Sequence, residues 1–272
     1  MKTSGSCRKD VLKTGRFLIP YRIYGDKGPQ LICINGVQQS MAMWQTLVAR
    51  FSRDYRIVLF DFPNQGKAKI LSGPAQVSLD EQVEILLAVM DETELSREGT
   101  ICAASWGGVI AVAFAAKYQD RTKRLILASL GTKPNQKMVE TIQQGSSLEM
   151  HDRGQMAQVL IKSFGETLPP RIKQTIARQF HTMTEENIRA FYEHGLYVIS
   201  SKQLCDVVNL KAIKVPTILL SGANDTILDL EDVKFLASQI PHCELRIIED
   251  VGHFLHMERE DVLDIYEEIL SS

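Results

Sequence analysis

Ser105 is the residue of this chain whose surroundings point most directly to catalysis. It lies in residues 100–108, where an apolar, strand-like segment leads into small residues and then into the Ala- and Val-rich helical segment 109–118. A sharp turn from strand to helix needs small residues two positions either side of the serine, here Ala103 and Gly107, because the backbones nearly touch. Such a turn leaves the hydroxyl at a helix N-terminus, where backbone N–H groups stabilise an oxyanion. The pattern predicts a nucleophile elbow for acyl transfer, with alanine replacing the first glycine of G-x-S-x-G.

Two further residues lie where a catalytic acid and base are needed. Asp225 comes just after the apolar segment 215–222, and His253 lies in the loop that follows the alternating segment 243–248. The chain order Ser105, Asp225, His253 is the nucleophile–acid–histidine order of the α/β-hydrolase fold. Since a serine hydroxyl attacks a carbonyl only when a base removes its proton, we expect His253 to be that base.

The histidine needs a carboxylate that holds its tautomer and stabilises the imidazolium. Glu249 and Asp250 are close in sequence, but they lie on the same loop as His253. This fold places the acid on the loop after the preceding strand, so we expect Asp225 to be the partner.

An oxyanion hole is expected from two backbone amides. The apolar strand 31–34 ends in Asn35-Gly36-Val37, so the N–H groups of Val37 and Trp106 are the predicted donors. The side chain of Trp106 either walls an acyl pocket or packs in the core. His256 follows His253 by three residues, but there is no H-E-x-x-H pattern, so we interpret it as a helix-face residue and expect no metal site and no cofactor.

Strands and helices alternate along most of the chain. This alternation predicts a mostly parallel sheet with helices on both faces. Residues 78–90 read as a helix with a capping box formed by Ser78 and Glu81. Outside the site, the pattern also predicts strands at 16–24, 56–60 and 124–130, a turn at 25–29 and a helix at 41–51.

The alternation breaks between residues 133 and 207, where the pattern is helical throughout. We predict that this stretch is a helical lid inserted over the catalytic face of an α/β-hydrolase core formed by residues 1–132 and 208–272. Its apolar side chains either pack against one another or line an acyl tunnel, for which flexible methionines are well suited. These side chains are Met138, Ile142, Met150, Met156, Leu160, Phe164, Ile172, Ile176, Phe180, Ile188 and Phe191.

Length and composition fit an α/β domain with an insertion. The 272 residues are 44% hydrophobic and 24% charged, with a formal net charge of −2. This balance gives no sign of a nucleic-acid-binding surface, and no apolar run approaches the roughly 20 residues of a membrane-spanning helix. The N-terminus lacks the apolar stretch of a signal peptide, and the five cysteines lie mostly in apolar segments. We therefore expect a cytoplasmic protein, not an integral membrane protein, without nucleic-acid partners.

Five segments spread along nearly the whole chain carry a family resemblance. They are Val83–Ala88, Ala104–Gly108, Leu168–Lys173, Pro241–Cys243 and Gly252–Leu255. Together they resemble the 3-hydroxyacyl-acyl-carrier-protein acyltransferases, a family that includes the synthase of the hydroxy-fatty-acid dimer of rhamnolipids.

The resemblance implies a reaction and a substrate. Ser105 would take a 3-hydroxyacyl group from a carrier-protein or coenzyme A thioester, and His253 would activate the hydroxyl of a second 3-hydroxyacyl molecule. The product would be a 3-(3-hydroxyalkanoyloxy)alkanoic acid, and Asp225 would be the catalytic acid. The loop Asp61–Lys67 departs from the family pattern, so the resemblance leaves the acceptor open.

Two other functions share the same residues. A carboxylesterase, thioesterase or lactone hydrolase would use the same triad with water as acceptor, and a non-catalytic ligand receptor would retain it unused. A haloalkane dehalogenase is disfavoured because its nucleophile would be aspartate. Arg171, Lys173 and Arg178, with no acidic residue in 171–180, are a candidate docking patch for an acidic acyl carrier protein; a solvated helix face explains them equally.

Overall fold

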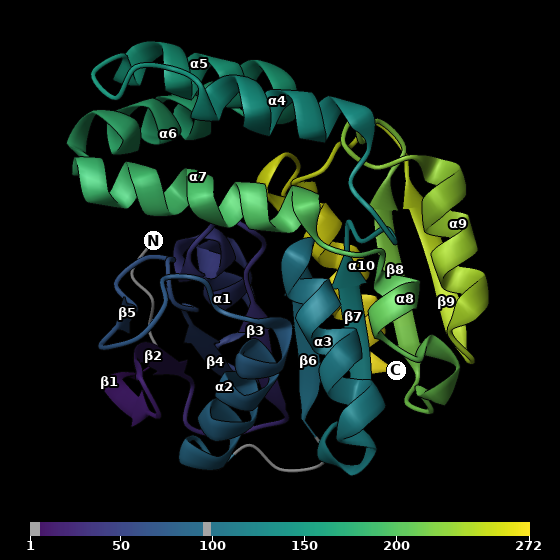
Figure 1. Ribbon diagram of the computed structural model, residues 1–272. Helices are drawn as coiled ribbons and strands as arrows, with labels where there is room; N and C mark the ends of the chain where they lie inside the picture. Colours follow the sequence, from purple (N-terminus) through teal and green to yellow (C-terminus); the bar gives the residue numbers. More distant parts are fainter. Residues whose placement is uncertain (1–5, 95–98) are drawn as a thin grey trace.

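A single mixed sheet runs through the molecule. The computed structural model describes residues 6–94 and 99–272, and within them the strand order is β1-β2-β4-β3-β6-β7-β8-β9, with β5 paired to β2 (Figure 1). Neighbouring strands from β4 to β9 along this order are parallel, whereas β2 is antiparallel to β1, β4 and β5. The strands are β1 (Cys7–Thr14), β2 (Phe17–Tyr24), β3 (Gln30–Ile34), β4 (Arg56–Phe60), β5 (Lys69–Ile70), β6 (Thr100–Ala104), β7 (Arg124–Ala128), β8 (Thr217–Gly222) and β9 (Cys243–Ile248).

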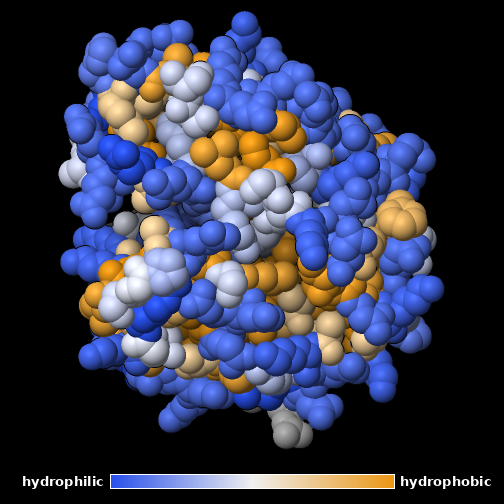
Figure 2. Space-filling view, in the orientation of Figure 1, coloured by the Kyte–Doolittle hydropathy of each residue, from blue (hydrophilic) through white to orange (hydrophobic). Residues whose placement is uncertain are grey.

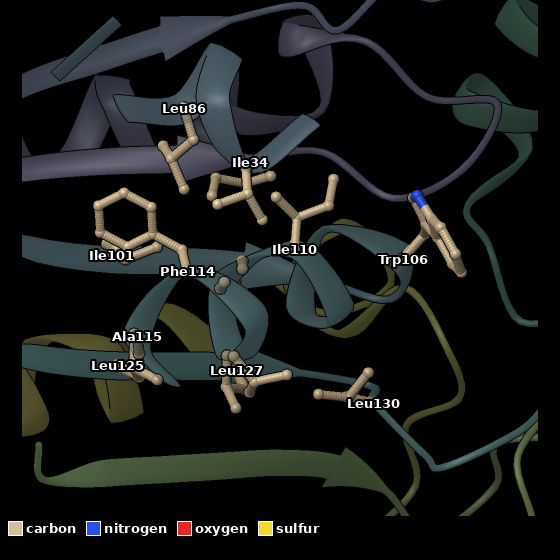
Figure 3. Packing of buried hydrophobic residues seen from close by; sticks show 14 of the residues in the cluster. Ile34, Leu86, Ile101, Trp106, Ile110, Phe114, Ala115, Leu125, Leu127 and Leu130 are labelled. Carbon is tan, nitrogen blue, oxygen red and sulfur yellow. The ribbon is translucent and has the colours of Figure 1, made fainter. Parts of the chain in front are cut away.

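Helices cover both faces of this sheet, as the alternating pattern predicts. One core lies between the sheet and α2 (Leu79–Glu92), α3 (Trp106–Lys117) and α9 (Leu230–Gln239). A second core lies between the opposite face and α1 (Gln45–Phe51) and α10 (Val262–Ser271). Figure 3 shows the first core from close by, with side chains of α2 and α3 packed over β3, β6 and β7. In the described part of the chain, none of the helices is long and apolar enough to cross a membrane.

Most predicted elements are present, with shifted ends. The capping box at the start of α2 is formed by Ser78 and Glu81, and the helix continues to Glu92. The helical segment 41–51 is a 3₁₀ turn at Met41–Trp44 followed by α1.

The strand predicted to begin the sheet is β2, but β1 precedes it. Residues of β1 are largely exposed and charged, so no apolar alternation marks this strand. It is held by main-chain pairing with β2 over its whole length, from Cys7 opposite Tyr24 to Thr14 opposite Phe17.

The helical segment inserted between β7 and β8 lies at the carboxyl ends of the central strands (Figure 1). It contains α4 (Gln136–Ser146), α5 (Arg153–Phe164), α6 (Pro170–Thr182), α7 (Glu185–Ser200) and the short α8 (Leu204–Val207). One hydrogen bond to the core comes from α7, whose Phe191 carbonyl accepts Nε2 of Gln38, in the loop after β3, at 2.9 Å. The assignment of this segment as a lid stays a prediction.

The apolar side chains of the insertion mostly pack against one another. Met156, Leu160, Phe180 and Ile188 form a small separate core with their neighbours. Met138 and Ile142, on α4, instead join the main core of the sheet. Figure 2 shows that apolar side chains gather on the visible face of the inserted helices, framed by polar ones. Mutual packing therefore accounts for the majority of the predicted apolar set.

Candidate active site

Ser105 lies on a strained turn between β6 and α3. Its backbone has φ 50° and ψ −122°, in the left-handed half of conformational space that a non-glycine residue rarely adopts. The Ser105 N–H donates to the Ala128 carbonyl at 2.8 Å, which ties the turn to the end of β7. A Cβ atom on Gly107 would lie 2.6 Å from the Asn35 carbonyl oxygen and 2.8 Å from that of Ile34. Only glycine fits there, which is the close backbone approach expected for an elbow.

Asp225 and His253 meet directly although 28 residues separate them. His253 Nδ1 and Asp225 Oδ2 are 2.7 Å apart, and both side chains are buried. The other carboxylate oxygen, Oδ1, accepts the N–H groups of Ile227 at 2.9 Å and Leu228 at 3.2 Å. These two bonds fix the rotation of the carboxylate, so Oδ2 is held toward the imidazole.

The alternative carboxylates do not reach the ring. Glu249 and Asp250 are exposed residues of the turn that leads to His253. Among the described residues, Asp225 is the carboxylate that bonds to the imidazole of His253.

Ser105 and His253 line one small pocket of about 10 Å³. Gln39, Ala104 and His256 are among the other residues that surround it. The ends of β6 and β9 therefore bring the predicted nucleophile and base to the same place, as parallel strands that end at one edge of a sheet must do.

Two side chains that sequence reasoning missed hold the His253 loop. Glu258 accepts the N–H groups of Gly252 at 2.7 Å and Phe254 at 2.9 Å, on either side of the histidine. Ser129, which follows β7 with φ 53°, donates its hydroxyl to the His253 carbonyl at 2.7 Å. The sequence gives only a weak indication of the role of Glu258, which is that it lies about one helical turn after the loop whose N–H groups it binds. Ser129 has no such signal, because its contact spans 124 residues.

The predicted oxyanion-hole amides stay a prediction, and the structure gives the hydrogen bonds around them. Among the described residues, the N–H groups of Val37 and Trp106 have no hydrogen-bond partner. The Gly36 carbonyl accepts Nε2 of Gln65 at 2.8 Å. Because a trans peptide points its N–H and C=O in opposite directions, this bond turns the Val37 N–H away from Gln65. Gly36 itself lies against the nucleophile, since a Cβ placed on it would be 3.1 Å from the Ser105 Cβ.

A buried polar network supports this amide from below. Asn35 donates from Nδ2 to Asp61 Oδ1 at 3.2 Å and accepts Nε1 of Trp44 at 3.0 Å. Asp61 also accepts the Met41 N–H at 2.6 Å, and burial raises the pKa of its carboxyl. A Cβ at Gly66, where φ is +50°, would collide with that carboxylate, so the loop requires glycine. The loop that departs from the family pattern is thus built to position Asn35, Gly36 and their neighbours.

The side chain of Trp106 is buried and belongs to the first core. Its Nε1 donates to Gln82 Oε1 at 2.9 Å, and its ring meets Tyr197 of α7 edge-on with centroids 5.8 Å apart. Figure 3 shows the ring at the N-terminal end of α3, set apart from the other labelled core side chains. The packing interpretation of this side chain accounts for its contacts.

His256 is a core residue in the short 3₁₀ turn Leu255–Met257. Its ring stacks on Trp44 at 5.3 Å, and Nε2 lies 3.2 Å from the Met43 carbonyl. Burial lowers the pKa of this imidazole to about 4, so it is neutral near pH 7. Its contacts are those of a packed aromatic ring.

Known proteins share this fold. The sequence profile of the α/β hydrolase fold family matches residues 29–260. The chain is 23% identical over 232 residues to the (R)-3-hydroxydecanoyl-ACP:CoA transacylase of Pseudomonas putida. This alignment covers 85% of this chain and 78% of the transacylase. It is 24% identical over 266 residues to 3-oxoadipate enol-lactonase 2 of Acinetobacter baylyi, covering 92% of each.

Solved structures agree on the fold. The enol-lactonase of Burkholderia xenovorans superimposes with a TM-score of 0.79 at 21% identity, covering 97% of this chain and all of that one (100%). The family profile spans most of the chain, and the two relatives described above are a transacylase and an enol-lactonase. The chain belongs to the α/β hydrolase fold family and is a hydrolase or an acyltransferase.

Proposed function

We propose that Ser105, Asp225 and His253 form a catalytic triad that transfers 3-hydroxyacyl groups from a carrier-protein or coenzyme A thioester. The observation that carries this proposal is the 2.7 Å contact between Asp225 and His253, made while His253 and Ser105 line one pocket. Similarity to a transacylase that acts on a 3-hydroxydecanoyl thioester supports the choice of substrate.

The first half of the reaction acylates the enzyme. His253 takes the proton of the Ser105 hydroxyl through Nε2 while the serine oxygen attacks the thioester carbonyl. The tetrahedral oxyanion accepts hydrogen bonds from the amides of Val37 and Trp106. Asp225 stabilises the imidazolium. The intermediate collapses, the C–S bond breaks, and the thiolate leaves with the proton from His253.

The second half transfers the acyl group to an alcohol. His253 takes the proton of the 3-hydroxyl of a second 3-hydroxyacyl molecule, whose oxygen attacks the acyl-serine carbonyl. The C–O bond to Ser105 breaks, and the serine regains its proton from the imidazolium. The dimer becomes a 3-(3-hydroxyalkanoyloxy)alkanoic acid when water cleaves the remaining thioester by the same chemistry.

Hydrolysis is the second candidate, because the same site runs with water as acceptor. Similarity to two enol-lactonases, one covering 92% of this chain and the other 97%, favours it. Transfer exceeds hydrolysis only when the acceptor alcohol is held in place and water is kept out of the site.

Product analysis tests both candidates. Purified wild type and Ser105→Ala are incubated with a 3-hydroxyacyl thioester of acyl carrier protein or coenzyme A, and the products are separated by mass spectrometry. We expect ester-linked dimers with the wild type and none with the variant. Free 3-hydroxy acids alone would assign the protein to the hydrolases, and equal turnover by Ser105→Ala would refute the triad.

Docking of a carrier protein is part of the same proposal. Arg171 and Arg178 are exposed on α6, and Lys173 is half-buried with its ammonium bonded to the Glu166 carbonyl at 2.6 Å. The two arginines are therefore the stronger candidates for an acidic partner. Charge reversal at both should raise KM for a carrier-protein thioester and leave KM for the coenzyme A thioester within twofold. An equal rise for both substrates would argue against docking at α6.

A further inference from the structure

One side chain of the α/β core reaches into the insertion beside the site. Nε2 of Gln38 donates to the carbonyl of Phe191 at 2.9 Å. Phe191 lies on α7, which runs between the core and the other long helices of the insertion (Figure 1). The Phe191 ring packs edge-on against Phe180 and Tyr192, within the small separate core of the insertion. Gln38 therefore bonds to the main chain of a part of the insertion whose side chains are packed.

A glycine of α7 makes room for this bond. Side chains on a helix lean toward its N-terminus, so the residue four positions after a carbonyl covers it. Four positions after Phe191 is Gly195, and a Cβ placed there would lie 2.7 Å from Nε2 of Gln38. The next nearest atoms to that Cβ are methyl groups of Ile142, at 3.2 and 3.3 Å. Gln38 therefore reaches the carbonyl because residue 195 has no side chain.

The backbone of Gln38 is strained. Its φ is 61°, which a residue other than glycine rarely adopts. Gln38 is the second central residue of the turn Gly36–Gln39, in which the Gln39 N–H donates to the Gly36 carbonyl at 3.4 Å. Turns with a positive φ at this position favour glycine there. A strained conformation persists only where the surrounding structure holds it, and the Phe191 carbonyl is the hydrogen-bond partner of the Gln38 side chain among the described residues.

The same turn carries a predicted oxyanion donor. Val37 is the first central residue of the turn and directly precedes Gln38. The core holds the peptide before Val37, because the Gly36 carbonyl accepts Nε2 of Gln65 at 2.8 Å. The insertion holds the residue after Val37, through the bond from Gln38 to α7. Separation of α7 from the core would release this second hold and let Gln38 relax to a negative φ, which would turn the neighbouring peptides.

We propose that Gln38 is a positioning residue that makes the orientation of the Val37 N–H depend on the position of α7. The inference rests on the proposed function, because that function assigns the Val37 N–H to the oxyanion. Catalysis is then fastest when the insertion is docked on the core, since α7 holds the turn in the shape that presents this N–H. The insertion thus contributes to the chemical step of the reaction.

Two substitutions on opposite sides of the bond test this role. Gln38→Ala removes the donor, and Gly195→Ala blocks its place on α7 with a Cβ. Each should lower kcat for hydrolysis of a p-nitrophenyl ester by about tenfold and leave KM within about twofold. This loss is a part of the roughly 100- to 1,000-fold that removal of a whole oxyanion donor costs. Because both substitutions remove one contact, the double variant should lose no more than Gln38→Ala alone.

The matched control is Gly154→Ala, because Gly154 is a helical glycine of the insertion with no atom within 4 Å of its Cβ position. Its kcat should equal that of the wild type. Alanine favours a helix more than glycine does, so Gly195→Ala should unfold at no lower urea concentration than the wild type, which separates positioning from a loss of folding. A kcat of Gly195→Ala within about twofold of the wild type, or effects that multiply in the double variant, would overturn the proposal.

Hydrogen exchange separates this inference from the proposed function. Mass spectrometry measures amide exchange in the peptide that contains residues 36–39, in Ser105→Ala and in Ser105→Ala with Gly195→Ala. The N–H groups of Gly36 and Gln39 are bonded within the turn, so a relaxed turn exchanges faster. Faster exchange with Gly195→Ala supports the hold by α7 even if the wild type turns over no ester, in which case the proposed function alone fails. Equal exchange in the two proteins would overturn the inference and leave the proposed function standing.

Discussion

Asp225→Asn is expected to inactivate the enzyme although it changes one atom. Oδ1 of this residue accepts two backbone N–H groups, from Ile227 and Leu228. In the amide of asparagine only the oxygen accepts hydrogen bonds. The asparagine must therefore place its Oδ1 against the two N–H groups and turn its NH₂ group toward His253. A flipped amide would set that NH₂ group against two N–H donors.

The NH₂ group then forces the wrong tautomer of the base. At 2.7 Å from Asp225, Nδ1 of His253 must accept a hydrogen bond from the amide, so the ring proton moves to Nε2. An Nε2 that carries a proton cannot take one from Ser105. The same change of tautomer in a serine-protease triad lowers kcat by roughly 10,000-fold, which is about 5 kcal/mol of transition-state stabilisation.

The assay is hydrolysis of a p-nitrophenyl ester by wild type, Asp225→Asn and the control Asp250→Asn. Asp250 is an exposed acid near the same loop, so its variant should match the wild type. Circular dichroism confirms that all three proteins are folded. A kcat for Asp225→Asn within tenfold of the wild type would refute this reasoning about the tautomer.

Three further predictions follow from the same geometry. Gln65→Leu removes the hydrogen bond to the Gly36 carbonyl that orients the Val37 N–H. It should lower kcat by roughly 10- to 100-fold with KM nearly unchanged. A parallel rise in KM would assign Gln65 a general structural role. Gly107→Ala should destabilise the protein by about 1–3 kcal/mol in urea unfolding, because its Cβ meets two backbone carbonyls. The control Gly154→Ala should not destabilise the protein, because there is open space around Gly154. Equal stabilities of the two variants would contradict the close approach at Gly107. His256 has a pKa of about 4 when folded and about 6.5 when unfolded, so the unfolded chain binds the extra proton between these values. His256 alone should therefore contribute a fall in stability of about 3 kcal/mol as pH drops from 7 to 4, and His256→Phe should reduce the total fall by about that amount. An unchanged pH dependence in the variant would contradict the assignment.

The parts of the site that could be predicted are those that follow buried parallel strands. Ser105 and Asp225 each come just after an apolar strand of the sheet centre, and a strand buried on both faces is legible as a continuous apolar run. The capping box of α2 was likewise local, because Ser78 and Glu81 lie within one turn.

The parts that could not be predicted arise from contacts between distant segments. Gln65 acts on Gly36 and Ser129 acts on His253 across 29 and 124 residues, and neither residue type is unusual where it stands. Strand β1 was missed because its side chains are exposed and its order comes from main-chain pairing.

The most direct test of the account is to trap the acyl-enzyme. Wild type and Ser105→Ala are mixed with a 3-hydroxyacyl thioester, quenched in acid and analysed by intact-mass and peptide mass spectrometry. The account predicts that the wild type gains the mass of one acyl group on the peptide that contains Ser105, and that the folded variant gains none. An acyl group on another residue, or undiminished thioester turnover by Ser105→Ala, would contradict it.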